Sequence, residues 1–496
     1  MRLQLLAAAT ALTLALAGCA SPGGLHPDGT LLDASALQAQ RSLAGHQAAA
    51  STWPASDWWS GLGDPQLNAL IAEALADNPG LAAADARSRQ AQAQVGLADA
   101  ARGPTVDAGA SIAGARIPTT LLPADVGGGH FAWAKYGYLS FNWGLDLWGG
   151  KRAAWEAAVG QTRAAEVEAR AARIELSGNV ARAYAELGYA FTQQDVAKAE
   201  LERAGKARAL TAQRVAAGID SRLQLKQGDA EVAQAEQQLA VSQRAIDAAR
   251  SALSVLLGKG PDRGLDIARP QLLQPAALTA PANLSVDLLG HRADLVAARW
   301  RVEAASKDIA SAKTAFLPNV NIGALAGLIA MGSTNLFQAP ARFYQAGPSL
   351  SLPIFDGGRL RANLAGKDAE YDLAVAQYNQ TLVGALNQVA DDYAAQQSLA
   401  TEVDAQQRAL EAARDAWQLA EQRYRAGVGS YLEALSVRQQ LLLAEQQMAA
   451  LKAQQVDLAV QLIQALGGGY RPEQRPGDDT HPAAATASSS TRPTRS

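Results

Sequence analysis

Apolar side chains recur at two different spacings along this chain. Between residues 295 and 312 they recur every three or four positions, which predicts a helix with one apolar face. Pro318 follows that stretch and Pro104 follows a matching one, so both predicted helices end before a proline. After each proline the spacing changes to two, which indicates strands.

The stretches with a spacing of two predict four β-strands. They cover 105–112 and 139–147 in the first half, and 319–330 and 342–354 in the second. One side of each strand is apolar and the other polar, as in a membrane barrel with a wet lumen. A soluble antiparallel sheet with one exposed face shows the same alternation. Tryptophans around one strand favour the membrane: Trp133, Trp143, Trp148 and Trp155.

A very long helical stretch follows each predicted hairpin. No proline interrupts 151–217 or 359–426, and a continuous helix of that length would reach about 100 Å. Each stretch then turns at a glycine, Gly218 or Gly427, and returns as a second helix. We expect both glycines to adopt a positive φ, as residues that follow a helix C-cap do.

The two halves of the chain repeat one another. Leu81 and Pro104 match Leu295 and Pro318, each pair being 214 residues apart. The string RVAAGIDSRL, which begins at Arg214, recurs as RYRAGVGSYL from Arg423. Because proline, glycine and serine align as well as alanine, the pattern indicates a tandem duplication.

The strand count has a physical consequence. A transmembrane barrel needs about eight strands or more, and an open sheet edge in lipid leaves unpaired backbone groups. If the four strands span a membrane, several chains must close the barrel together. We therefore expect a homo-oligomer, and three chains would supply twelve strands.

The N-terminus predicts export and a lipid anchor. Arg2 precedes an apolar stretch at 3–17 that is typical of a signal peptide. Leu16-Ala17-Gly18-Cys19 resembles the lipobox of bacterial lipoproteins, in which the cysteine carries diacylglycerol and an N-acyl chain. An ordinary thiol at Cys19 is the alternative. Ala20 stands where aspartate would, by analogy, retain a lipoprotein in the inner membrane, so the outer membrane is favoured.

Composition narrows the chemistry further. Lys and Arg number 44 against 47 Asp and Glu, and the net charge of −3 argues against a nucleic-acid binder. A single cysteine excludes a disulfide framework or a multi-cysteine zinc site, and the five histidines form no HExxH motif. We interpret Asp391-Asp392 as a solvated pair on a helix and not as a catalytic dyad. We expect no enzyme activity, no metal site and no cofactor beyond lipid at Cys19.

Residues 53–470 resemble the bacterial outer-membrane factors, the TolC-like exit ducts of tripartite efflux pumps, in their lipoprotein (NodT-type) branch. The resemblance is carried by Trp58-Trp59 with GDPQLNALIAEALADNPGL, and by FNWGLDLWGGKR, LSLPIFDGGRLRANL, QRYRAGVGSYLEAL and QALGGGY. It implies an α+β membrane protein, a homotrimer whose twelve-stranded outer-membrane β-barrel, four strands per chain, continues into a periplasmic α-helical barrel.

The resemblance also implies partners and a function. A periplasmic adaptor (a membrane fusion protein) and an inner-membrane transporter of the RND or another type would supply coupling and energy. The trimer, surrounded by outer-membrane lipid, would passively export drugs or small toxic solutes.

The predicted elements divide the chain into nine segments. They are a signal peptide (1–18), a lipidated tether (19–50), first-half helices with an equatorial part (51–104), a first β-hairpin (105–148), a first long helical hairpin (149–258), an equatorial linker with the second-half helix (259–317), a second β-hairpin (318–355), a second long helical hairpin (356–470) and a disordered tail (471–496).

By the family resemblance, the adaptor docks at the two helical turns through an RxxxGxxSxL pattern. The matching residues here are Arg214, Gly218, Ser221 and Leu223, and Arg423, Gly427, Ser430 and Leu432. A purely structural interpretation competes with docking: glycine and serine would cap helices, and leucine would pack against a neighbour.

The resemblance further implies a narrow aperture at these turns, often with acidic residues just after the second one. Glu433 matches such a position, whereas Ser436 stands where the family commonly has aspartate, which weakens the transfer of an aspartate ring. Tyr424 and Arg425 are candidates for bonds that hold the tips closed. A solvated surface charge is the alternative for Arg425.

Two other functions compete with drug efflux. The same architecture could serve as the exit duct of a protein or peptide (type I) secretion system. A periplasmic structural lipoprotein made only of coiled coil would explain the long helices without any channel.

Overall fold

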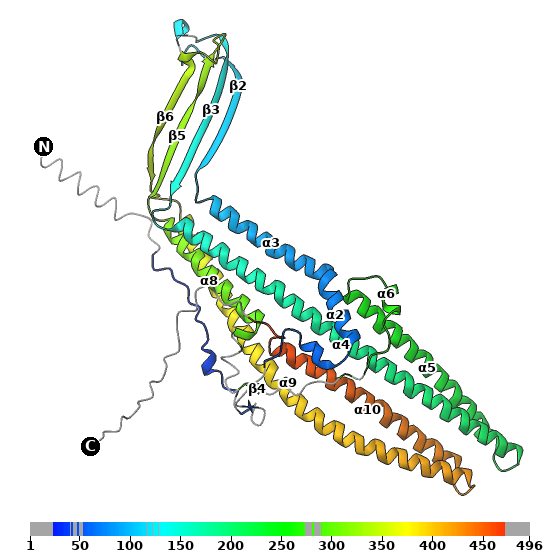
Figure 1. Cartoon of the computed structure of the whole chain (residues 1–496). Coiled ribbons are helices and arrows are strands. Elements are labelled where there is room, and N and C mark those ends of the chain that lie inside the picture. Colours follow the sequence, from blue (N-terminus) through cyan, green and yellow to red (C-terminus); the bar gives the residue numbers. More distant parts are fainter. Residues whose placement is uncertain are drawn as a thin grey trace, which may run out of the picture.

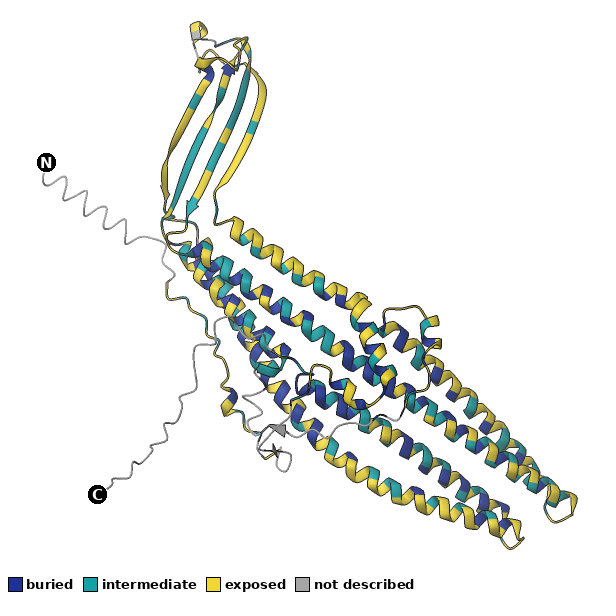
Figure 2. Cartoon of the chain, viewed as in Figure 1, coloured by how far each residue is buried: buried dark blue, intermediate teal, exposed yellow. Residues whose placement is uncertain are grey.

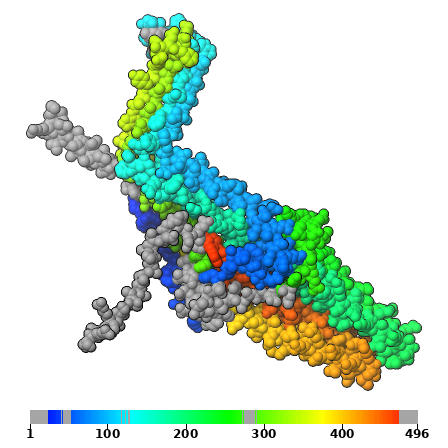
Figure 3. Space-filling view, viewed as in Figure 1, coloured from blue at the N-terminus to red at the C-terminus, as the bar shows by residue number. Residues whose placement is uncertain are grey.

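The computed structural model is elongated, with a four-stranded sheet at one end and a bundle of long helices at the other (Figures 1 and 3). It describes residues 23–39, 41–42, 47–48, 53–116, 118–121, 123–126, 128–271, 273, 280–281, 288 and 290–471. Cys19, most of the expected tether beyond residue 39 and nearly all of the expected disordered tail lie outside these ranges.

The sheet contains two antiparallel hairpins. Its strands are β2 (Thr105–Arg116), β3 (Phe131–Leu145), β5 (Asn319–Met331) and β6 (Arg342–Ser351). Their order is β2-β3-β5-β6, so the two repeats join through the antiparallel pair of β3 and β5. Among the described strands, neither β2 nor β6 has a partner on its outer side. The four-strand expectation is confirmed.

One predicted strand begins too late. The sequence predicted it from Leu139, whereas β3 begins at Phe131. In the missed stretch FAWAKYGY, aromatic residues occupy both faces of the strand, because Trp133 lies on one face and Tyr136 on the other. A strand with apolar residues on both faces loses the alternation from which it could be predicted.

Two helical hairpins form the long part of the molecule. The first comprises α4 (Gly150–Ala216) and α5 (Arg222–Leu256), and the second α9 (Arg359–Arg425) and α10 (Tyr431–Ala465). The first helix of each hairpin has 67 residues without a break, which gives a length of about 100 Å. The long continuous helices expected from the absence of proline are confirmed.

Shorter helices pack along the hairpins on the sheet side. They are α2 (Pro65–Asp77), α3 (Pro79–Ala100), α6 (Asp262–Leu265) and α8 (Ala293–Thr314). Buried residues follow the middle of the bundle, whereas β2, β6 and much of α3 are exposed and the central strands β3 and β5 are mostly half-buried (Figure 2). The largest cluster joins α2, α4 and α5 through side chains such as Leu70, Tyr184 and Leu253.

The N-terminal segment lies against α9. The backbone N–H of Gly29 donates to Asp372 at 2.6 Å, and Asn379 accepts from Leu32 and donates to the carbonyl of Thr30. Ala34 joins the core cluster that contains Tyr378. Residues 23–39 are therefore held along the second hairpin, close in sequence to Cys19.

Two features are absent from the described residues. No helix there is long and apolar enough to cross a membrane. No group of three or more His, Cys, Asp or Glu is placed in that part of the chain to hold a metal ion.

The interpretation of Asp391-Asp392 as a solvated pair is wrong for one of the two. Asp391 is exposed, but Asp392 is buried. Burial, with the nearby charge of Asp391, raises the pKa of Asp392 from 3.8 to about 6. The period of a long helix that is buried on several sides does not reveal which polar positions face inward.

Asp392→Asn is expected to stabilise the protein at pH 8 and not at pH 4. A carboxyl whose folded pKa is raised favours folding below its unfolded pKa, and that contribution is lost as the pH rises through about 6. The gain at pH 8 should be about 1–3 kcal/mol per chain. Thermal unfolding at both pH values measures it, with exposed Asp391→Asn as the control. A gain at pH 4 equal to that at pH 8 would contradict the assignment.

Candidate functional site at the hairpin tips

The two helical turns lie together at the end of the bundle far from the sheet (Figure 1). Gly218 and Gly427 have φ of +73° and +77° and follow the last helical residues, as expected. The Ser221 side chain accepts from the N–H of Gln224 in a capping box, and the Ser430 side chain accepts from that of Glu433. The predicted caps are confirmed, so these four residues have a structural role at the turns.

The leucines of the RxxxGxxSxL pattern do not pack. Leu223 is 68% exposed and Leu432 is 69% exposed. Ile219 and Val428, at the turns themselves, are also more than half exposed. The interpretation that these leucines pack against a neighbouring segment is therefore wrong within a single chain. The tips expose apolar side chains to solvent.

The two tips are joined by a cluster around the buried side chain of Tyr424. The Tyr424 hydroxyl donates to Asp220 Oδ2 at 2.8 Å and lies 3.0 Å from the Thr211 hydroxyl. Arg214 forms an ion pair with Asp220 at 2.8 Å, and its guanidinium lies 4.8 Å from the centre of the Tyr424 ring. We call Thr211, Arg214, Asp220 and Tyr424 the tip latch.

The electrostatics of the tip latch favour an ionised aspartate and a protonated tyrosine. The guanidinium of Arg214, together with the Tyr424 hydroxyl, lowers the pKa of Asp220. Burial raises the pKa of Tyr424, which is only 4% exposed. A phenol donor and a charged acceptor make a strong hydrogen bond, so the latch ties the second hairpin to the first.

The other two expected aperture residues do not join the hairpins. Arg425 forms an ion pair with Glu421 on its own helix. Glu433 lies 3.5 Å from Arg423 across the second turn, and both side chains are about half exposed. Ser436 Oγ contacts the carbonyl of Glu433 within α10. Within one chain, the bridging tip residue among the expected three is therefore Tyr424.

A second set of inter-hairpin bonds lies farther from the turns. Arg438 of α10 is 2% exposed and pairs with Glu200 of α4 and Glu231 of α5, at 3.0 and 2.5 Å. Arg203 of α4 pairs with Glu200 and with Glu445 of α10. We call these five residues the inner network. Burial raises the pKa of Glu200, against the opposing effect of both arginines.

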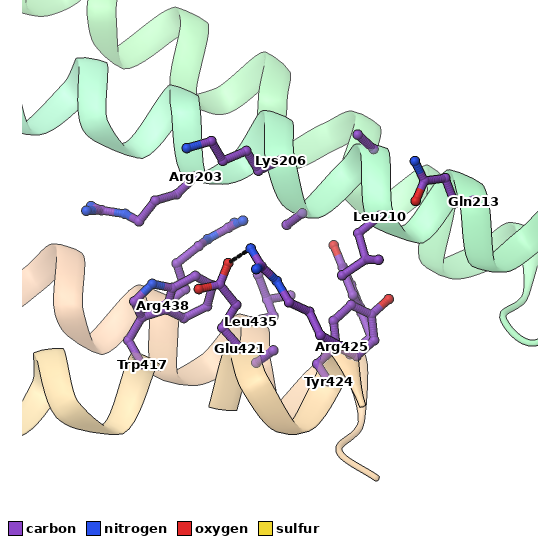
Figure 4. Close-up of a pocket in the computed structure, with 14 residues that line it drawn as sticks. Arg203, Lys206, Leu210, Gln213, Trp417, Glu421, Tyr424, Arg425, Leu435 and Arg438 are labelled. Carbon is purple, nitrogen blue, oxygen red and sulfur yellow. Dashed lines mark hydrogen bonds and ion pairs between the residues drawn. The ribbon is translucent and has the colours of Figure 1, made fainter. Parts of the chain in front are cut away.

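A cavity of about 290 Å³ lies between Tyr424 of the tip latch and Arg203 and Arg438 of the inner network (Figure 4). Trp417 and Tyr424 line it from α9, Tyr431 from α10 and Leu210 from α4. The hairpins are thus joined at two levels with a partly empty layer between them.

Sequence reasoning missed most residues of both clusters. Thr211, Asp220 and all five members of the inner network were not predicted. One signal was present, because Asp220 follows Arg214 by six positions, whereas Gly429 stands six positions after Arg423. This difference between the repeats marks the turn that supplies the acceptor.

Known proteins resemble this chain in sequence. The sequence matches the family described as "Outer membrane efflux protein" over residues 70–259 and 284–468. Fusaric acid resistance protein FusA of Burkholderia cepacia is 37% identical over 368 residues, which cover 73% of this chain and 69% of FusA. Multidrug resistance outer membrane protein MdtP of Escherichia coli K12 is 32% identical over 432 residues, 85% of this chain and 88% of MdtP.

A solved structure extends the match to three dimensions. The outer membrane protein VceC of Vibrio cholerae matches with a TM-score of 0.78 and 36% sequence identity. The match covers 84% of this chain and 100% of that one, so it includes the sheet as well as the helices.

Proposed function

This chain belongs to the outer membrane efflux protein family, and on that premise we propose that its hairpin tips are both the gate and the adaptor-docking end of an exit duct. As a family member it is a non-enzymatic outer-membrane channel of an efflux system that extends into the periplasm. The fold and the family together exclude a structural lipoprotein made only of coiled coil. The names of FusA and MdtP favour drugs or small toxic compounds over secreted proteins as cargo.

The free edges of the sheet support a trimer. Channels of this family are trimeric, and β2 and β6 each leave one edge unpaired in the described sheet. Unpaired backbone groups in lipid cost several kcal/mol each. Pairing β6 of one chain with β2 of the next removes all edges and gives a closed barrel of twelve strands.

The exposed tip leucines support docking of a periplasmic adaptor. Leu223 and Leu432 stand on the returning helices two positions after the capping serines, and both are mostly exposed. An amphipathic helical hairpin could cover them by placing its apolar face in the groove between the tips. An inner-membrane transporter of the RND or another type would complete the pump.

A photo-crosslinking amino acid placed at Leu432 is expected to capture the adaptor in living cells. Leu443, which is 57% exposed on the same helix but three turns from the tip, is the matched control. Mass spectrometry identifies the captured protein. Capture of a periplasmic protein from Leu432 and not from Leu443 supports docking at the tips. Equal capture from both positions, or none from Leu432, would refute it.

A lipid at Cys19 completes the proposal. Residues 23–39 are fixed along α9, so an acylated Cys19 would tether the second hairpin of each chain to the membrane. The mass of the mature N-terminal peptide tests this directly, because an unmodified peptide would exclude the anchor.

A further inference from the structure

The register of the sheet assigns every strand residue to one of two faces. On the first face, Val106 of β2 pairs with Phe141 of β3, and Phe141 pairs with Ala324 of β5. That face is apolar along most of its length and holds exposed side chains such as Ile112 and Leu139. It is the face that suits lipid, so the second face borders the lumen of the channel.

The lumenal face changes character halfway along the strands. The dividing row runs across the sheet through Gly109, Tyr138, Gly327 and Phe343. On the helix side of this row the face is polar, with Asp107, Asn142, Asn321 and Ser349, and Leu325 is the one large apolar residue among the described positions.

From that row outward, the lumenal face is apolar and aromatic. Tyr136, Tyr138, Ile329, Met331 and Phe343 lie there, and Ser111 is the one polar non-aromatic residue among the described strand positions. No described strand residue of this half carries a charge on the lumenal face. A barrel lumen filled only with water would not require such a surface.

Three rings form the centre of this surface. Tyr136 stacks on Phe343 with ring centres 5.6 Å apart and planes 13° apart. Tyr136 also contacts Tyr138, with ring centres 5.0 Å apart. Two of the rings cover glycines. A Cβ at Gly109 would lie 2.5 Å from the Tyr138 ring, and a Cβ at Gly327 would lie 2.8 Å from the Phe343 ring. Such aromatic–glycine pairs stabilise strands.

Tyr136 does not have this role of covering a glycine. Its cross-strand neighbours are Ser111 and Ile329, so it covers no glycine, yet it extends the aromatic surface into the lumen. Resting on the channel function, we propose that Tyr136, Tyr138 and Phe343 of each chain form a lumenal site that transiently binds uncharged, planar aromatic solutes on their way out. Continuity with the exit path, the absence of charge and the ring stacking together favour this occupant.

Planar-bilayer recordings of the purified trimer test the site. The probes are the tripeptide Gly-Trp-Gly with an acetylated N-terminus and an amidated C-terminus, which is aromatic and uncharged, and Gly-Leu-Gly blocked in the same way as the aliphatic control. Both are added on the barrel side, so that they reach the rings without passing the hairpin tips. We expect current interruptions with Gly-Trp-Gly only. Tyr136→Ser should shorten them about twofold to tenfold, as expected for the loss of one aromatic contact.

Two further variants separate the site from general effects. Tyr136→Phe should keep the interruptions, and Asn142→Ala, on the polar half of the same face, should leave them unchanged. Equal interruptions with both tripeptides, or an unchanged Tyr136→Ser, would overturn the proposal. A further outcome would also overturn it. If interruptions appear only after Phe337→Ser, the loop beyond β5 that carries Phe337 occupies the aromatic site in the unmodified protein, and not a solute. A trimer that conducts no ions at all would instead contradict the channel function.

Discussion

Replacing Tyr424 by phenylalanine is expected to raise the single-channel conductance of the purified trimer several-fold. The variant removes the hydroxyl that bonds to Asp220 and Thr211 and leaves the packing of the ring in place. Because the bond to Thr211 is buried and the bond to Asp220 is partly buried, their loss should cost about 1–3 kcal/mol per chain, which changes the ratio of open to closed tips about fivefold to 150-fold. Three chains share one aperture, so the effects combine.

Tyr378→Phe is the matched control for this result. Tyr378 is a buried tyrosine on the same helix, α9, but it lies in the core cluster near the N-terminal segment, far from the tips. Its replacement should leave conductance unchanged. Arg425→Ala and Glu433→Ala, which break exposed contacts, should have smaller effects than Tyr424→Phe. If Tyr424→Phe conducts like the wild type while Glu433→Ala conducts more, the gate is an acidic ring and not the tip latch.

Arg438→Met is expected to cause a large loss of stability. The guanidinium of Arg438 lies between Glu200 and Glu231, and its removal leaves one buried and one half-buried carboxylate without that partner. Removing one member of a buried ion pair typically costs about 3–5 kcal/mol. The temperature at which the trimer loses its folded migration on a gel, or the denaturant midpoint of unfolding, measures the loss.

The control for Arg438 is an arginine in an exposed pair. Arg425 is more than half exposed beside Glu421, so Arg425→Met should cost less than about 1 kcal/mol. Adding Glu231→Gln to Arg438→Met should restore part of the stability, because it removes one unpaired charge. Similar losses for Arg438→Met and Arg425→Met would show that the inner network does not hold the hairpins together.

Prolines and glycines at the ends of helices explain why so much of the fold could be predicted from the sequence. Pro104 and Pro318 end helices, and Gly218 and Gly427 end the two longest ones at positive φ. These effects act within a few residues along the chain, so the sequence contains them explicitly. The strand number and the duplication follow from the same local signals.

The features that escaped prediction depend on contacts between distant segments. Asp220 and Tyr424 are 204 positions apart, and Arg203 bonds to Glu445 across 242 positions. Nothing in the local pattern of α4 distinguishes Glu200, which is buried, from Glu202, which is exposed. Likewise, β3 begins earlier than predicted because its lumenal face becomes aromatic and the alternation disappears. The family resemblance pointed to the tips as a region, and the structure identifies which side chains meet there.

The most direct test of the account is cross-linking between neighbouring chains at the free sheet edges. In a Cys19→Ser background, one cysteine replaces Ala346 on β6, and a second replaces Val106, Ala108 or Ala110 on β2. All four positions lie on the apolar face. If three chains close one barrel, oxidation should produce covalent dimers and trimers for at least one pair and none for single-cysteine variants. Monomers alone for every pair would contradict the trimeric duct.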